Sequence, residues 1–329
     1  MASIVTAWFR FCLTGDTNCY RFFVVRVLLV VNSFASSVTA RNTVVVHQHL
    51  ARHHTVQVVE TNRRGHATRF AEDAARRGLD CVVSFGGDGT LNEVATGIAG
   101  SETALGVLPG GSTNVFARTI GMSNDPAEAV KQLALALDTE RIAPIGLGKV
   151  NGRYFCFHTG VGYDAAVVRN VERRAALKRW LGHPLFVGAA LHTWALGYSR
   201  KDPHFSVHIG EEQPVNGYFS IVMNTNPYTF LGKKPLNLSP HANLDSGLSV
   251  VTFTSLSALT LLGSLGKAIR SGGVPESKHV KIREDVQTMS VTNDRPFPFQ
   301  LDGDYLGETN ELRFTHEPHA VRLVQPLLS

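Results

Sequence analysis

In Val82–Gly100 (VVSFGGDGTLNEVATGIAG), three glycines and an aspartate lie between an apolar run of residues and an amphipathic one. Thr90 and Glu93 have capping-box spacing, which predicts that a helix begins at Thr90. Gly86–Gly89 is then a strand-to-helix turn, either purely structural or a phosphate site built from free N–H groups and the helix dipole. A bare phosphate site would avoid a further negative charge, so Asp88 favours a divalent cation between its carboxylate and the phosphates.

A second turn of the same kind follows in Leu105–Gly121 (LGVLPGGSTNVFARTIG). No lysine follows the glycines of the first turn, which is therefore not a Walker A loop, and it does not have the GxGxxG spacing. Two such turns at the carboxyl ends of strands in one parallel sheet can face a common crevice. Arg118 lies one turn into the next expected helix, where it could bind phosphate bidentately or form a surface ion pair.

A third polar turn occurs near the end of the chain, in Phe299–Glu308 (FQLDGDYLGE). Asp302 and Asp304 flank Gly303 directly after an expected strand. Asp-Gly is the commonest hairpin turn, so this pattern alone favours a structural role. A carboxylate directed into a cleft would instead serve as the general base for a hydroxyl group.

The elements that position these turns change in kind along the chain. Strands and helices alternate from Arg26 to about Ala143, which predicts a parallel, doubly wound sheet. Short strands follow from Ile145, which predicts an antiparallel sandwich or barrel interrupted by helical stretches at 164–197 and 256–271. We therefore expect an α/β chain with an extension of uncertain structure at 1–25, an α/β nucleotide-binding domain at 26–144 and a β-sandwich domain at 145–329.

The composition excludes several classes of protein. Hydrophobic residues make up 43% and charged residues 18% of the 329 residues, as in a globular protein. The net charge of +5 suits an anionic substrate or membrane surface and is too weak to indicate nucleic acid. Four cysteines without a CxxC pair fit a reducing cytoplasm. The histidines of His47–His54 favour a solvated helix face over a metal site.

The glycine turns carry a resemblance to a known family. GGDGTLNEV together with LPGGSTNVFAR resembles the diacylglycerol kinase catalytic family, which includes soluble bacterial lipid kinases and sphingosine kinases. ETNRRGHA, FHTGVGYDAAVV and LDGD resemble further elements of that family. The likeness extends from about Arg26 to the end of the chain, and the combination is specific where each piece alone is not.

The resemblance implies an ATP-dependent lipid kinase, with an NAD-kinase-like first domain, a lipid-binding β-sandwich and ATP in the cleft between them. Asp88 would act with Mg²⁺, and Asp302 or Asp304 would take the proton from the hydroxyl of diacylglycerol or a related long-chain lipid alcohol. The residues expected to line the nucleotide are Asn32, Thr61, Gly86, Gly87, Asp88, Gly89, Thr90, Asn92, Glu93, Gly111, Ser112, Thr113, Asn114 and Arg118.

Three departures from the family pattern bear on these expectations. The first loop, usually Asn-Pro-x-Ser-Gly, is NSFASS here and keeps only Asn32 of the Asn, Pro and Gly. The family's Asp-Gly-Glu is Asp-Gly-Asp, which leaves open whether Asp302 or Asp304 is the base. The family's second domain often holds a structural Mg²⁺ at an Asp-Asp-Gly turn. Ser246 stands before the glycine here, so Asp245 is the remaining acid and we expect no tight metal binding.

The segment Arg169–Gly197 begins strongly basic and then turns apolar, with Trp180 and Trp194. It fits an interfacial segment meeting anionic headgroups, or equally a solvated helix followed by a core helix. We expect a cytoplasmic, peripherally membrane-associated protein that takes a lipid at a membrane surface and binds no nucleic acid, with monomer and homodimer both open. The alternatives are an NAD kinase, which shares the GGDG loop, and a catalytically inactive lipid-binding module.

Overall fold

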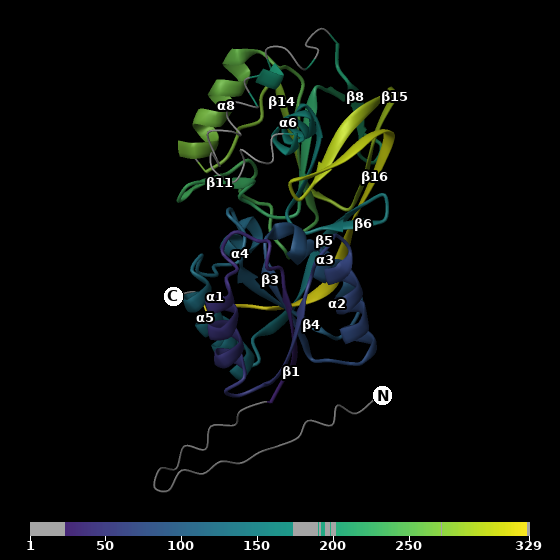
Figure 1. Cartoon of the computed structure of the whole chain (residues 1–329). Helices are drawn as coiled ribbons and strands as arrows, with labels where there is room; N and C mark the ends of the chain where they lie inside the picture. Colours follow the sequence, from purple (N-terminus) through teal and green to yellow (C-terminus); the bar gives the residue numbers. More distant parts are fainter. Residues whose placement is uncertain are drawn as a thin grey trace, which may run out of the picture. The chain divides into compact units, whose positions relative to one another are not determined.

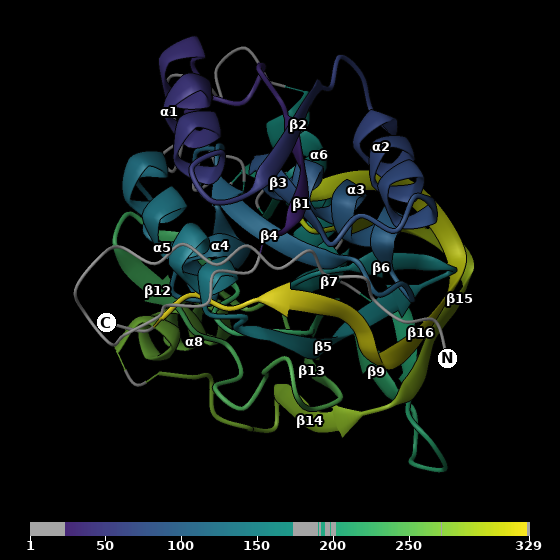
Figure 2. The same cartoon turned by 90° about the horizontal axis from the view of Figure 1, so that it is seen from below.

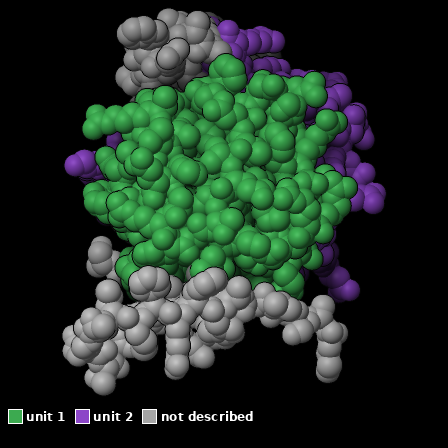
Figure 3. All heavy atoms as spheres, turned by 60° about the horizontal axis from the view of Figure 1, so that its bottom comes forward, with its two compact units in different colours: residues 1–144, 321–329 green, residues 145–320 purple. Residues whose placement is uncertain are grey.

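The computed structural model describes residues 24–173, 190, 192–194, 198, 202–270 and 272–327, and the chain forms two compact units. Unit 1 contains Met1–Pro144 and Val321–Ser329, and unit 2 contains Ile145–Ala320 (Figure 3). The division falls at the domain boundary expected from the sequence, except that the last residues belong to the first unit. Residues 1–23, nearly all of the expected extension, lie outside the described residues.

Unit 1 is built on a parallel sheet with the strand order β2-β1-β3-β4, and the last residues of β16 pair parallel with β4. Its elements in chain order are β1 (Arg26–Val31), α1 (Ala40–Leu50), β2 (Thr55–Glu60), α2 (His66–Arg76), β3 (Cys81–Gly86), α3 (Asp88–Ile98), β4 (Ala104–Pro109), α4 (Val115–Thr119) and α5 (Pro126–Asp138).

Helices cover both faces of this sheet. Figures 1 and 2 show α1 and α5 on one side of the strands and α2 and α3 on the other. Every residue of β3 and β4 is buried, as expected for parallel strands covered on both faces. The predicted N-cap of α5 is also confirmed, because the Asp125 carboxylate accepts hydrogen bonds from two N–H groups of its first turn. The doubly wound α/β fold expected from the sequence is thus present.

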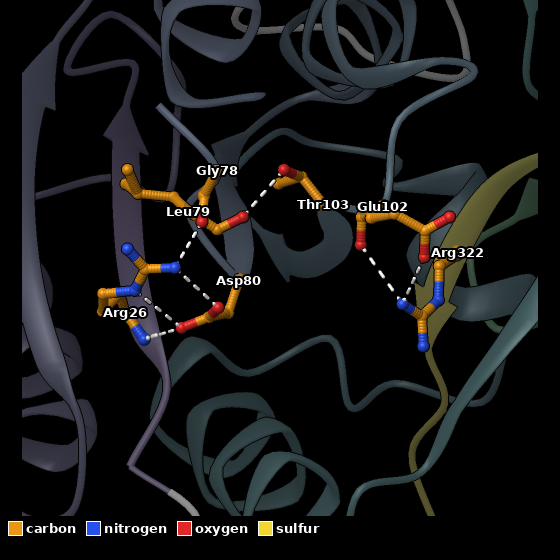
Figure 4. A network of polar contacts seen from close by, with 7 residues as sticks. All are labelled: Arg26, Gly78, Leu79, Asp80, Glu102, Thr103 and Arg322. Carbon is orange, nitrogen blue, oxygen red and sulfur yellow. Dashed lines mark hydrogen bonds and ion pairs between the residues drawn. The ribbon is translucent and has the colours of Figure 1, made fainter. Parts of the chain in front are cut away.

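A polar network joins the amino ends of the same strands, at the sheet edge away from the glycine turns (Figure 4). The Arg26 guanidinium, on the first residue of β1, meets the Asp80 carboxylate at 3.0 Å, and Asp80 directly precedes β3. Thr103 Oγ1, just before β4, donates to the Leu79 carbonyl at 2.7 Å. Arg322 of β16 pairs with Glu102 at 3.0 Å. Arg26 is therefore an exposed ion-pair residue that precedes the buried run of β1.

Unit 2 contains an antiparallel sheet with the order β14-β13-β10-β7-β15-β16, to which β5, β6, β8 and β9 add, and a separate β11–β12 hairpin. Its strands are β5 (Ile142–Val150), which crosses the unit boundary, β6 (Arg153–Phe155), β7 (His158–Gly162), β8 (Phe205–His208), β9 (Val215–Gly217), β10 (Phe219–Met223), β11 (Thr229–Leu231), β12 (Lys234–Leu236), β13 (Leu248–Phe253), β14 (Val280–Val286), β15 (Thr288–Leu301) and β16 (Asp304–Val324); its helices are α6 (Tyr163–Glu172) and α8 (Ala258–Arg270).

Both faces of the unit 2 sheet are buried at its strands β7, β10 and β13, which explains why these strands lack an exposed polar face. Val222 of β10 and Val250 of β13 belong to one hydrophobic cluster. Their neighbours Ile221 and Val251 point to the opposite face and belong to another. This arrangement of an antiparallel sheet between two cores is the sandwich-like domain expected from the sequence. The helix expected at 256–271 is α8, and α6 covers the beginning of the one expected at 164–197.

Candidate active site

The strand order of unit 1 reverses between β1 and β3, because β2 lies on the far side of β1. In doubly wound sheets, ligands bind beyond the carboxyl ends of the strands at such a switch point. Asn32 follows β1 here, and its N–H donates to the Phe85 carbonyl of β3 at 3.0 Å. Its side-chain amide donates to Thr90 Oγ1 at 2.9 Å. Thr61, buried after β2, donates its N–H to the Val31 carbonyl at 2.8 Å. The altered first loop thus still places Asn32 at the switch point.

The two glycine turns lie against each other, backbone to backbone. The N–H of Gly110 donates to the Gly86 carbonyl at 2.7 Å. A Cβ on Gly110 would lie 2.7 Å from Gly86 Cα, and one on Gly111 would lie 2.9 Å from Gly87 Cα. Side chains cannot occupy these spaces without displacing backbone. The glycines are therefore required for the mutual approach of the two turns.

Asp88 is the first residue of α3, with Gly87 as its N-cap. Its carboxylate accepts hydrogen bonds from the N–H groups of Val115 at 3.0 Å and Phe116 at 3.2 Å. It therefore caps the short helix α4. Burial raises the pKa of Asp88, and these N–H groups partly oppose the shift. A carboxylate offers about four acceptor positions, so Asp88 can bind a metal or a metal-bound water besides these N–H groups.

The capping box predicted from Thr90 and Glu93 is wrong, because α3 begins two residues earlier. Thr90 is buried, and its hydroxyl accepts the Asn32 amide. The Glu93 carboxylate accepts from Gly65 N–H at 2.8 Å and Ala67 N–H at 3.1 Å, at the beginning of α2. Both side chains were also expected to line the nucleotide, and that stays a prediction.

The second turn is held by its own side chain, Asn114. This residue has a left-handed φ of 49° and is buried. Its Oδ1 accepts the N–H of Gly111 at 2.7 Å, and its Nδ2 donates to the Gly111 carbonyl at 2.8 Å. Ser112 at the tip is exposed, whereas Thr113, Arg118 and Asn92 are half-buried. Burial lowers the pKa of the Arg118 guanidinium.

These residues fit a magnesium-bound nucleotide. The first N–H groups of α3, at Asp88, Gly89 and Thr90, have no partner within the helix, so its N-terminus can receive a phosphate. Mg²⁺ usually keeps several waters and needs only one or two carboxylates besides substrate phosphates. Among the residues that the structure describes, no group of three His, Cys, Asp or Glu could hold a metal alone. Asp88 would therefore share the ion with the phosphates.

In unit 2, Asp302 and Gly303 form a two-residue hairpin turn between β15 and β16. Their φ values of 47° and 84° are those of a type I′ turn. The Asp302 carboxylate is buried and accepts three N–H groups, from Cys156 at 2.7 Å, Phe157 at 3.0 Å and His158 at 3.1 Å. Asp304 opens β16 and is half-buried. Which of the two acids is the base stays open.

A buried polar network beside this turn was not predicted. Asp164, part of the family resemblance but given no role there, accepts hydrogen bonds from Tyr228 at 2.5 Å and Gln300 at 2.9 Å. Burial raises the pKa of Asp164, and both partners oppose the shift. The His158 ring lies 4.4 Å from that of Tyr228, and burial lowers the pKa of His158 to about 3. The only sequence signal was an acid directly before the apolar run AAVV.

Two further expectations meet the structure in part. Asp245 is exposed, and the N–H of Gly247 in the same turn donates to Asp285 at 2.8 Å. The expected lack of tight metal binding at Asp245 stays a prediction. In the histidine cluster, His54 is buried with Nε2 3.6 Å from the Asp138 carboxylate, so the solvated-face interpretation is wrong for this residue.

Most of the expected interfacial segment, including Trp180, lies outside the described residues. Within it, Trp194 is half-buried, and its indole N–H donates to the Leu256 carbonyl at 2.9 Å. This contact favours the interpretation of Trp194 as a packed residue. No helix in the described part of the chain is long and apolar enough to cross a membrane.

Comparison with known proteins gives one family throughout. The model of the diacylglycerol kinase catalytic domain matches residues 26–150. The Pseudomonas aeruginosa protein called "Probable lipid kinase YegS-like" is 31% identical over 92% of this chain and 94% of its own length. The Bacillus subtilis diacylglycerol kinase is 39% identical over 37% of this chain and 39% of its own length. A solved structure of a diacylglycerol kinase from Bacillus anthracis str. Sterne has a TM-score of 0.67 at 19% identity, covering 92% of this chain and 97% of that one.

The chain therefore belongs to the diacylglycerol kinase catalytic-domain family. It is a lipid kinase, that is, a phosphotransferase with a lipid acceptor. The likeness to the solved structure shows that the two-part fold is shared.

Proposed function

We propose that this lipid kinase transfers the γ-phosphate of ATP, with Mg²⁺, to the hydroxyl of diacylglycerol or a related long-chain lipid alcohol. The observation that carries the proposal is the pair of glycine turns packed on each other at the switch point of the unit 1 sheet, with Asp88 at the start of α3. Phosphoryl transfer asks a protein mainly to position the reactants and to neutralise charge. The N-terminus of α3 and a cation beside Asp88 supply both.

The residues divide into four roles in this proposal. Asn32 and the two turns hold the nucleotide, and Asp88 binds the metal directly or through a water. Asp302 or Asp304 of unit 2 takes the proton from the attacking hydroxyl. Glu93 and Asn114 act by positioning, since their side chains are engaged with the backbone of α2 and of the second turn. The expected cleft between the domains stays a prediction.

The test uses purified full-length protein with γ-labelled ATP, Mg²⁺ and mixed micelles carrying diacylglycerol, a sphingoid base or no lipid, with NAD as a soluble acceptor. We expect label in a lipid product, strongest with diacylglycerol or a near relative. Label only in NADP would replace the proposal by an NAD kinase. Absence of both transfer and ATP binding would favour a catalytically inactive lipid-binding module.

A further inference from the structure

Helix α8 of unit 2 (Ala258–Arg270) carries an exposed apolar side. Leu259 is 86%, Leu262 67%, Leu265 43% and Ile269 38% exposed. Residues three or four positions apart share a helix face, so these side chains form one stripe. We call this stripe the α8 face.

The α8 face is unusual within the molecule. Five other large hydrophobic residues are exposed in the described part of the chain, and they lie singly on different elements, as is normal for a soluble surface. A contiguous stripe of four instead marks a contact surface. Gly263 and Gly266 of the same helix also face open space, because a Cβ added to either would meet nothing within 4 Å.

The helix does not need this face for its own packing. Ala268 is fully buried and belongs with Leu261 to the hydrophobic cluster on one side of the unit 2 sheet. The Ala268 carbonyl also accepts the N–H of Asn237, just after β12, at 3.1 Å. The β11–β12 hairpin therefore lies next to α8, as Figure 1 shows. The helix is fixed by its inner side and presents leucines on the outer one.

The chain segment that contains α8 and the β11–β12 hairpin carries mostly positive charges. Lys267 and Arg270 lie in the last turn of α8, and the exposed Lys233 and Lys234 lie at the tip and on the second strand of the neighbouring hairpin. From Gln213 to Pro275 these are the four Lys and Arg residues, against one acid, Asp245. The acids that flank this range, Glu212 and Glu276, are both paired with Arg283.

We propose that the α8 face, with the tip of the β11–β12 hairpin, is the surface by which this protein docks on an anionic phospholipid bilayer. Leucines on one side of a helix and cations beside them match the acyl-chain boundary and the charged headgroups of such a surface. The helix would lie in the plane of the interface, since its 13 residues are too few to span a bilayer. The inference rests on the proposed function, because the acceptor of a lipid kinase lies in a bilayer.

The experiment measures co-sedimentation of the full-length protein with vesicles of phosphatidylcholine alone or with 30% phosphatidylglycerol, without ATP. We expect L259Q/L262Q to weaken binding to the anionic vesicles by at least about tenfold. K233Q/K234Q should weaken it by roughly fivefold per lysine and reduce its salt dependence, since two of the four cations are lost. The matched control is V44Q/L135Q, at exposed positions of α1 and α5, which should bind like the wild type.

Three results would overturn the inference. The first is binding by L259Q/L262Q within twofold of the wild type, and the second is no binding of the wild type to either vesicle. The third is a wild-type dimer that L259Q/L262Q converts to a monomer in light scattering, since a second copy would then cover the face. Phosphorylation of a short-chain diacylglycerol in detergent micelles is measured in parallel. If the wild type does not phosphorylate this lipid, the proposed function is contradicted, while the vesicle measurement still tests the α8 face.

Discussion

Two turns in this molecule place an aspartate beside a glycine, and each aspartate binds backbone N–H groups far away in the sequence. Asp88 of unit 1 accepts two N–H groups at the beginning of α4. Asp302 of unit 2 accepts three, at the connection from β6 to β7. The first turn lies at a helix N-terminus and a topological switch point, whereas the second is a tight hairpin. The same residue pair thus lies where a phosphate can bind in unit 1 and in a tight hairpin in unit 2.

The surroundings of Asp88 indicate a chemical role. Desolvation there disfavours the ionised carboxylate and so raises its pKa. A purely structural cap is normally exposed, as Asp125 is at the start of α5. A half-buried carboxylate with a raised pKa beside a glycine turn is the pattern of a functional site. Asp302 is more deeply buried, and it accepts three N–H groups.

The largest expected effect is on activity, from Asp88→Asn. We expect a loss of kcat of about a thousandfold, since the metal loses its protein carboxylate. The free energy of unfolding should fall by only about 1 kcal/mol, because an asparagine still caps a helix. Asp125→Asn is the matched control, a second capping aspartate that should lose similar stability and no activity. Equal activity in both variants, measured by the micelle assay and chemical denaturation, would make Asp88 a cap and nothing more.

The next effect compares the two acids of the hairpin. Asp302→Asn should lower the stability of the protein by about 2–4 kcal/mol, because an amide NH₂ would face the N–H of Cys156 in a buried place. Asp304→Asn should change stability by less than about 0.5 kcal/mol. The two variants should differ sharply in kcat, which is measured only on material that circular dichroism shows to be folded. If both variants keep the kcat of the wild type, this turn has only a structural role.

The burial of His158, on the strand beside Asp302, predicts that the stability of the protein depends on pH. Burial lowers the pKa of His158 to about 3, so the folded state excludes a proton that the unfolded state takes up below about 6.5. Stability is therefore lost as the pH falls through this range, by roughly 2 kcal/mol at pH 5. Denaturation curves of the wild type and His158→Gln between pH 7 and 5 measure it. Asp164 acts in the opposite direction, so the difference between the two proteins is the informative quantity. The same change of stability with pH in the wild type and in His158→Gln would show that His158 is not its cause.

The smallest expected effect concerns the contact between the glycine turns. Gly110→Ala should destabilise the protein by about 1–2 kcal/mol and reduce ATP affinity, because the new methyl group meets the backbone of Gly86. Gly263→Ala is the control, in the open middle of α8, where alanine should stabilise the helix by about 0.5–1 kcal/mol. Thermal denaturation and nucleotide titration distinguish the cases. A neutral Gly110→Ala would show that the turns can separate without cost.

Local patterns were a good guide to the fold and a poorer one to side-chain roles. Alternating strands and helices predicted the sheet of unit 1, and Asp125 before Pro126 predicted the start of α5. Thr90 and Glu93 had equally good spacing, yet the helix begins at Asp88 and Glu93 caps α2 instead. A capping box competes with every other N–H group that folding brings near the same carboxylate. The neighbouring helix, invisible in the local spacing, provided the better partners.

The sequence by itself determined the parallel α/β order of unit 1, the antiparallel strands of unit 2, the place of the glycine turns and the family. These follow from the period of apolar residues and from short motifs, which are local properties of the chain. The tertiary structure alone decided what each carboxylate meets. Asp88 bonds Val115 at a separation of 27 residues, and Asp302 bonds His158 at 144. Such partners depend on how the strands are ordered in space, and no spacing within a motif encodes that order.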